Sequence, residues 1–121
     1  MKLMIVDDSL VIRNKINRTL LAKFNGVLRA ENGVQAIELV ISEKPDVITM
    51  DLTMPKMGGV EAIQQIIGIA PSTHILVVSA LADKATAISA LSYGANGFLC
   101  KPFTEHELSS AIERIIDIEL S

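Results

Sequence analysis

The chain has 121 residues, of which 11 are Lys or Arg and 14 are Asp or Glu, giving a formal net charge of −3 at pH 7. This length suits a single domain over residues 1–121, and half of the residues are hydrophobic, enough for a buried core. A mildly acidic chain without a Lys/Arg-rich run is a poor candidate for direct nucleic-acid binding. The single cysteine, Cys100, excludes a disulfide framework and a multi-cysteine zinc site.

Neither a membrane-spanning nor a secreted protein is expected. No apolar stretch approaches the roughly 20 residues needed to cross a bilayer. The apolar run at the N-terminus meets Asp7 and Asp8 too soon to be a signal peptide, so we expect a cytoplasmic protein without membrane insertion. Aromatic residues are few, which argues against base-stacking surfaces and against a flavin held between rings. They are Phe24, Tyr93, Phe98 and Phe103.

Short apolar runs recur along the chain at the spacing expected for strands. The runs are continuous and do not alternate with polar residues, which is typical of strands buried on both faces of a parallel sheet. The expected strands, in chain order, are Leu3–Val6, Val27–Ala30, Val47–Met50, Ile75–Val78 and Gly97–Cys100.

The segments between these runs carry apolar residues at helical spacing. Thr104 and Glu107 have the spacing of a capping box, which predicts the start of the last helix. Asn32-Gly33 and Gly58-Gly59 indicate turns or helix starts. The expected apolar stripes are Ile12, Ile16 and Leu20; Ile37, Val40 and Ile41; Ile63, Ile66 and Ile67; Ile88 and Leu91; and Leu108, Ala111, Ile112 and Ile115.

This alternation predicts an α/β fold, a (βα)₅ three-layer sandwich with a flavodoxin-like, doubly wound parallel sheet. For five strands the common order is 2-1-3-4-5, which places the topological switch point between strands 1 and 3. Ligands of such sheets bind at the carboxyl ends of the strands beside that point. The site is therefore expected at the ends of strands 1 and 3.

Polar residues close the apolar runs at that same edge. They are Asp7 and Asp8 after the first strand, Asp51 after the third, Ser79 at the end of the fourth and Lys101 after the fifth. Because parallel strands end at one edge, these side chains are expected to converge. Taken singly, each has a simpler interpretation, since Asp8 or Ser9 suits a helix cap and a lone lysine is ordinarily solvated. Their coincidence at successive strand ends favours a functional site.

Three carboxylates at one point repel one another. Two like unit charges ~4 Å apart repel each other by about 4 kcal/mol at an effective dielectric constant near 20. Either the pKa of one carboxyl group is therefore raised, or the three carboxylates bind a cation. Oxygen ligands alone select a hard ion, Mg²⁺ or Mn²⁺. Lys101 and Ser79 offer an ammonium and a hydroxyl for phosphoryl oxygens. Asp51 lies centrally and is the expected nucleophile for an aspartyl phosphate.

The order and spacing of these residues resemble the receiver domain of two-component response regulators, the CheY-like fold, over the whole chain. The resemblance rests on Val6-Asp7-Asp8-Ser9; Met50-Asp51-Leu52-Thr53-Met54-Pro55 with Gly58-Gly59; Val78-Ser79-Ala80; and Gly94-Ala95 before Lys101-Pro102-Phe103. Each piece is weak alone, and together they are highly specific.

The resemblance implies a role for each site residue. Asp51 would accept a phosphoryl group from the phosphohistidine of a histidine kinase or phosphotransfer protein. Asp8, Asp51 and the backbone carbonyl of Thr53 would bind Mg²⁺, with Asp7 acting through a water molecule. Ser79 and Lys101 would bind phosphoryl oxygens, and Lys101-Pro102 would be a cis peptide, which proline makes accessible.

The resemblance also implies a switch. Ser79 would move toward the phosphoryl group, and Phe98 would turn inward and reshape the surface formed by the fourth helix, the fifth strand and the fifth helix. Plain core packing is the simpler interpretation of Phe98. That surface would control an effector protein, with chemotaxis or motility among the outputs. The protein would be a monomer or a phosphorylation-dependent dimer.

Several residues of this chain differ from the family pattern, and these differences lead to predictions. Ser79 replaces the commoner Thr, and Phe98 replaces the Tyr of the chemotaxis regulators. Thr53 and Leu81 occupy the positions that tune hydrolysis of the phosphoaspartate, and neither has an amide or carboxylate to orient a water molecule. Slow self-dephosphorylation is therefore expected.

The leading interpretation is thus a signalling switch, not an enzyme with turnover on an external substrate. The alternatives are a haloacid-dehalogenase-type phosphatase, a receiver used only for docking and a flavodoxin-like electron carrier. His74 and His106 are expected on the surface, Cys100 is expected to be buried, and Met54 and Met57 are expected to pack and not to bind.

Overall fold

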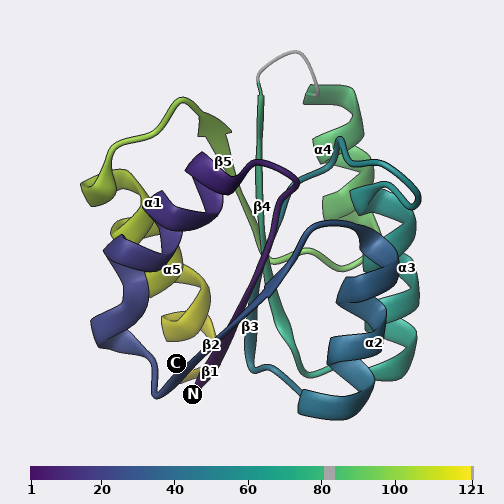
Figure 1. Ribbon diagram of the computed structural model, residues 1–121, viewed down its shortest axis with the longest axis horizontal. Helices are drawn as coiled ribbons and strands as arrows, with labels where there is room; N and C mark the ends of the chain where they lie inside the picture. Colours follow the sequence, from purple (N-terminus) through teal and green to yellow (C-terminus); the bar gives the residue numbers. More distant parts are fainter. Residues whose placement is uncertain (81–83, 121) are drawn as a thin grey trace.

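The computed structural model of the protein describes residues 1–80 and 84–120. Strands and helices alternate along the chain (Figure 1). The strands are β1 (Lys2–Val6), β2 (Gly26–Ala30), β3 (Val47–Met50), β4 (His74–Ala80) and β5 (Gly97–Lys101). The helices are α1 (Leu10–Leu20), α2 (Gly33–Glu43), α3 (Gly59–Ile69), α4 (Lys84–Ser92) and α5 (Glu105–Leu120), with a short 3₁₀ helix, η1 (Leu21–Lys23), after α1.

The sheet is parallel and has the order β2-β1-β3-β4-β5, which confirms the predicted flavodoxin-like fold. Helices α1 and α5 cover one face, and α2, α3 and α4 cover the other (Figure 1). Val6 pairs with Met50 across β1 and β3, so Asp7 and Asp51 leave the sheet side by side at the switch point. β1 begins and α5 ends at the opposite edge of the sheet (Figure 1).

Two apolar clusters hold these layers together. The cluster under α2, α3 and α4 includes Met4, Ile48, Met50, Ile63 and Ile66. The cluster under α1 and α5 includes Leu3, Ile5, Ile16, Leu20, Leu108 and Ile112. Both faces of the central strands are therefore buried, which explains their continuous apolar runs. Among the described residues no helix is long and apolar enough to span a membrane.

One predicted stripe is wrong. In α4 the buried positions are Ala87 and Ala90, whereas Ile88 and Leu91 are 59% and 41% exposed. Small residues let this short helix lie close to the sheet, and its larger apolar side chains are left in solvent. In α2, Ile41 is likewise exposed, although Val40 is buried as predicted.

Strand ends also differ from the prediction. β4 begins at His74, whose N–H donates to the carbonyl of Asp46 at 3.0 Å, so this histidine is buried and not on the surface. His106 is exposed, as expected. Cys100 is half-buried because β5 is an edge strand. Ser79 lies near the end of β4, as expected, whereas Lys101 is the last residue of β5 and was predicted to follow that strand.

The first turn of α3 packs directly against the backbone after β3. A Cβ at Gly59 would collide with the carbonyl oxygen of Asp51 and come within 2.7 Å of the Leu52 Cα. Only glycine permits this approach, which holds α3 against the residue that ends β3.

Alanine substitutions at the two glycines of α3, Gly59 and Gly68, should therefore change the free energy of unfolding in opposite directions. Gly59→Ala should lower the free energy of unfolding by about 1–3 kcal/mol or more, because backbone must move to admit the methyl group. Gly68→Ala meets nothing within 4 Å. It should raise stability by roughly 0.5–1 kcal/mol through helix propensity. Urea unfolding of both variants is the measurement, and equal effects of the two would contradict this account of Gly59.

Candidate functional site

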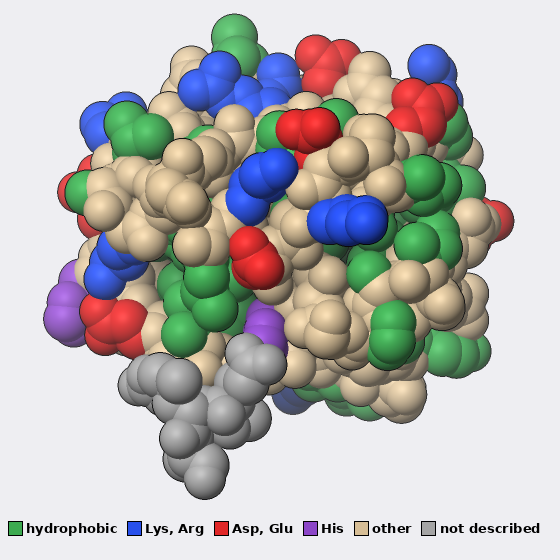
Figure 2. Space-filling view, turned by 90° about the horizontal axis from the view of Figure 1, so that it is seen from below, with side chains coloured by type: hydrophobic (Ala, Val, Ile, Leu, Met, Phe, Trp, Pro, Cys, Tyr) green, Lys and Arg blue, Asp and Glu red, His purple; other side chains and the backbone are tan. Residues whose placement is uncertain are grey.

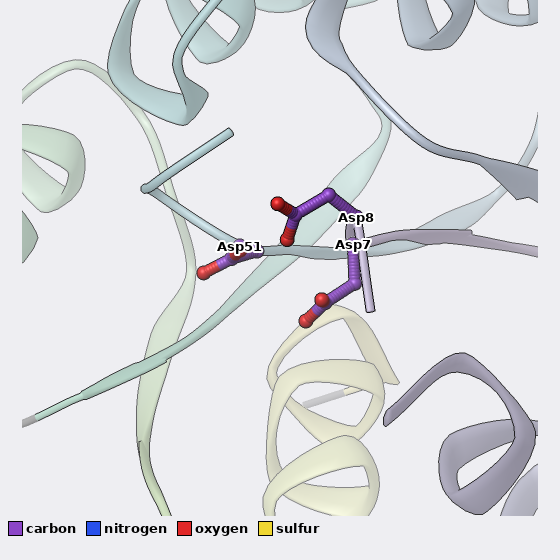
Figure 3. A group of neighbouring side chains, drawn as sticks. All are labelled: Asp7, Asp8 and Asp51. Atoms are coloured by element: carbon purple, nitrogen blue, oxygen red, sulfur yellow. The ribbon is translucent and has the colours of Figure 1, made fainter. Parts of the chain in front are cut away.

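Three carboxylates meet at the carboxyl edge of the central strands. Asp7 and Asp8 follow β1 and Asp51 follows β3, and one ligand oxygen from each lies within 4.8 Å of the others. Figure 3 shows these three side chains as neighbours, with the Asp8 carboxyl group on the side of Asp51. Asp7 and Asp51 are buried, whereas Asp8 is exposed. The parallel register brings them together, since the Asp51 N–H donates to the carbonyl of Val6 at 2.9 Å.

Ser9, not Asp8, caps α1. Its hydroxyl accepts a hydrogen bond from the N–H of Ile12 at 3.3 Å, and its own N–H donates to the Asp7 carboxylate at 2.9 Å. The capping interpretation therefore applies to Ser9. Asp8 lies just before the cap, with its carboxylate among the other acids (Figure 3).

Lys101 brings a positive charge into this cluster. Its Nζ lies 2.8 Å from Asp7 Oδ2 and 3.5 Å from Asp51 Oδ1. Burial alone would lower the pKa of Lys101, but the hydrogen bond and charge of Asp7, with the charge of Asp51, outweigh it and raise that pKa above its ordinary value. The lysine is therefore a fixed cation at the site.

The segment after Lys101 is held by α1. The Lys101–Pro102 peptide bond is cis. Lys15 of α1 donates from its Nζ to the carbonyl of Phe103, and the same Nζ lies 4.4 Å from the centre of the Phe103 ring. A cation over an aromatic face is attractive, so this contact ties the end of β5 to the first helix.

Ser79 completes the edge. It is buried near the end of β4 and pairs with Cys100, one residue before the Ala80–Lys101 pair. The hydroxyl-bearing residue and the lysine therefore belong to neighbouring strands at the end of the sheet where the acids lie.

The loop between β3 and α3 is fixed by close backbone contacts. The N–H of Gly33, at the start of α2, donates to the carbonyl of Met57 at 3.2 Å, and that of Gly59 donates to Leu52 at 3.1 Å. The N–H of Thr53 lies 3.5 Å from Asp51 Oδ1, at the limit of a hydrogen bond. Met54 and Met57 pack against the core, as expected.

Burial and the neighbouring carboxylates change the pKa of Asp51. Burial, followed by the charge of Asp7, raises the pKa of Asp51 from 3.8 to about 6, although Lys101 and the Thr53 N–H act in the opposite direction. The single positive charge of Lys101 thus does not balance the negative charge of three carboxylates. The clustered ligand atoms are all carboxylate oxygens, and this set fits Mg²⁺ or Mn²⁺. Asp8 and Asp51, with Asp7 beside them, are the residues of this cluster that would hold the ion.

Two predicted residues remain, Phe98 and Leu81. Phe98 is half-buried on β5 and packs against the cluster under α2, α3 and α4. Leu81 lies outside the described residues.

Arg13 is a residue that the sequence analysis missed. It lies on the buried face of α1 with Ile16 and Leu20, and its guanidinium donates to the carbonyl of Asp7 at 2.6 Å. The signal was present, because Arg13 precedes Ile16 by three residues and Leu20 by seven, which places a charge within the apolar stripe.

Fold and site together define a class of small α/β domains with an acidic site at the switch point of the sheet, where the residues could hold a divalent cation. Comparison with known proteins then identifies the family. The sequence pattern described as "Response regulator receiver domain" matches residues 3–113, and the chain belongs to this family. Receiver domains are regulatory, so the family does not support the phosphatase or electron-carrier alternatives.

The relatives include chemotaxis proteins. The chain is 36% identical over 115 residues to the chemotaxis protein CheY of Listeria monocytogenes, covering 94% of this chain and 97% of that protein. It is 36% identical over 117 residues to CheY of Bacillus subtilis, covering 96% and 98%. The solved structure of Vibrio cholerae chemotaxis protein CheY4 matches with a TM-score of 0.86 at 29% identity, covering 94% and 97%. The domain is thus CheY-like in sequence and in fold.

The raised pKa of Asp51 predicts a pH dependence of stability. Folded protein holds this proton more tightly than unfolded protein, so the contribution of Asp51 to stability falls as the pH rises from 3.8 to about 6. In EDTA, Asp51→Asn should be more stable than wild type above that range by up to about 3 kcal/mol, with little difference near pH 4.

Chemical unfolding of both proteins across this pH range is the measurement. Glu38→Gln removes an exposed carboxylate of α2 and serves as the matched control, with no change expected. A pH-independent difference between wild type and Asp51→Asn would contradict the assignment.

Proposed function

We propose that the protein is a phosphorylation-activated signalling switch whose phosphoacceptor is Asp51. The observation that carries the proposal is the position of its carboxylate, 3.5 Å from Lys101 Nζ and within the same oxygen cluster as Asp7 and Asp8. The phosphoryl donor is the phosphohistidine of a histidine kinase or phosphotransfer protein. The protein is not an enzyme with an external substrate, and it catalyses only its own phosphorylation and dephosphorylation.

In the transfer, a carboxylate oxygen of Asp51 attacks the phosphorus, a P–O bond forms and the P–N bond of the phosphohistidine breaks. The departing imidazole takes up a proton from solvent. Such transfers depend on positioning and on neutralising charge more than on a strong base. Lys101 and Ser79 bind phosphoryl oxygens, and Asp7 holds Lys101 in place. Asp8 and Asp51, with Asp7 acting through a water molecule, would hold a Mg²⁺ ion, which would supply further charge neutralisation.

The surroundings of the site suit a protein donor. At the start of α1, Leu10 is 61% and Val11 is 76% exposed, immediately after the acidic pair. Exposed apolar side chains grouped beside a reactive group offer a contact area to a partner. This supports transfer from a docked protein in addition to small phosphodonors.

The switch that we propose links Ser79 to Phe98. Phe98 pairs with Val77, two residues before Ser79, so both side chains leave neighbouring strands on the same face of the sheet. When Ser79 shifts toward the phosphoryl group, Phe98 turns inward, and the populations of two surface arrangements change.

The output surface is formed by α4, β5 and α5. Ile88 and Leu91 are exposed on α4, and a cavity of about 340 Å³ beside Phe98 is lined by residues of β5 and α5 that include Gly97, Arg114 and Ile115. An effector protein binding here would sense Phe98 directly, and chemotaxis or motility control is the output that the CheY relatives favour. We place the protein in the cytoplasm as a monomer or a phosphorylation-dependent dimer, without direct nucleic-acid contacts.

The first test is intact mass after incubation with acetyl phosphate, with and without Mg²⁺. We expect a gain of one phosphoryl group that requires Mg²⁺ and is lost in Asp51→Asn, because the carboxylate is the acceptor. No gain under any condition would leave the fold intact and move the protein to the docking-only alternative.

The same samples test the switch. Phosphorylation should change amide hydrogen exchange over α4 and β5, with α2 as the internal reference. Phosphorylated protein with unchanged exchange in β5 would contradict the role given to Phe98.

Thr53 predicts a slow loss of the phosphoryl group. It has no amide or carboxylate to orient an attacking water, so the phosphorylated protein should persist for well beyond seconds. Thr53→Asn places an amide there and should shorten the half-life, and Thr53→Val is the matched control that adds no amide. The decay of phosphoprotein after removal of acetyl phosphate is the measurement, and a wild-type half-life of seconds would contradict the prediction.

A further inference from the structure

A charged side chain is buried behind the acidic pair. Arg13 is 7% exposed on α1, yet its guanidinium has two partners, a backbone carbonyl just after β1 and a carboxylate just after β2. Nη1 donates to the backbone carbonyl of Asp7 at 2.6 Å, and Nη2 lies 3.5 Å from Glu31 Oε1, just after β2. Burying a guanidinium is costly unless its donors are satisfied, so these partners determine where the side chain lies.

The bond to Asp7 acts on the peptide that joins the two acids. The Asp7 N–H donates to the carbonyl of Ala30 at 3.1 Å, and the Asp7 carbonyl accepts from Arg13. Because the peptide unit is planar, fixing this carbonyl fixes the direction in which the chain leaves toward Asp8. The side chain of Asp8 is exposed, so the contact with Arg13 orients Asp8 through its backbone.

We propose that Arg13 is a positioning residue for the cation site, a role that rests on the Mg²⁺ site of the proposed function. It holds the Asp7–Asp8 peptide so that the Asp8 carboxylate faces Asp51. Groups behind the ligands of a metal commonly tune its affinity in this way. The planar fork of arginine suits the task, since one arm reaches Asp7 while the other reaches Glu31.

The test is the Mg²⁺ dissociation constant, measured by calorimetry, together with the rate of phosphorylation by acetyl phosphate at increasing Mg²⁺. Arg13→Met should weaken Mg²⁺ binding by roughly 10-fold to 100-fold. Its phosphorylation rate should recover at saturating Mg²⁺, because Asp51, Ser79 and Lys101 are untouched. Arg13→Lys keeps one donor and should restore part of the affinity.

Two controls separate positioning from loss of stability. Glu31→Gln leaves the bond to Asp7 intact and removes a partner whose side chain is 64% exposed, so its dissociation constant should stay within about two-fold of wild type. Ile16→Ala destabilises the same helix through the core and should leave Mg²⁺ affinity unchanged while lowering the melting temperature.

The Mg²⁺ affinities of these variants either support or overturn the positioning role of Arg13. Mg²⁺ affinity equal to wild type in folded Arg13→Met, or an equal loss in Ile16→Ala, would overturn it. If Arg13→Met does not fold, Arg13→Gln, whose amide is too short to span to Asp7, is judged by the same criterion. Wild-type protein that binds no Mg²⁺ would instead refute the metal site of the proposed function, and the role of Arg13 with it.

Discussion

The contact between Lys101 and Asp7 is the interaction on which the site depends. Three carboxylates at the end of one sheet repel one another, and Lys101 is 2.8 Å from one and 3.5 Å from another. Without it the repulsion between the carboxylates would raise the pKa of Asp51 further, because the charge of Lys101 acts to lower that pKa. A single lysine nevertheless leaves an excess of negative charge, which favours a divalent cation at this site, and such a cation would offset the charge of an incoming phosphoryl group.

Much of this arrangement could be predicted from sequence. A continuous apolar run followed by an acid places Asp7 and Asp51 at strand ends, and the strand order then brings them together without any knowledge of contacts. The same reasoning failed for Ile88 and Leu91, because periodicity alone does not show that the smaller Ala87 and Ala90 allow α4 a closer approach to the sheet. Burial of His74 depends on the pairing of β4 with β3, which a local pattern does not reveal.

Arg13 illustrates a second limit. The residue pattern predicts chemistry at the strand ends and only packing for helix α1. The spacing of Arg13 shows a charge within an apolar stripe, but its role follows only from its partners, which are a main-chain carbonyl after β1 and an exposed acid after β2. A contact to a main-chain carbonyl cannot be deduced from residue types. The close approach of Gly59 to Asp51 belongs to the same category, although the paired glycines at least indicated a turn.

β1 begins and α5 ends at the edge of the sheet remote from the acids (Figure 1). An affinity tag or fluorescent protein joined at the beginning of the chain would therefore lie the length of the sheet away from the acidic cluster, and the same holds for a fusion after α5. Immobilisation through that edge would present the acidic end of the domain to a solution of partners, which makes the fold a natural format for surface-based binding assays.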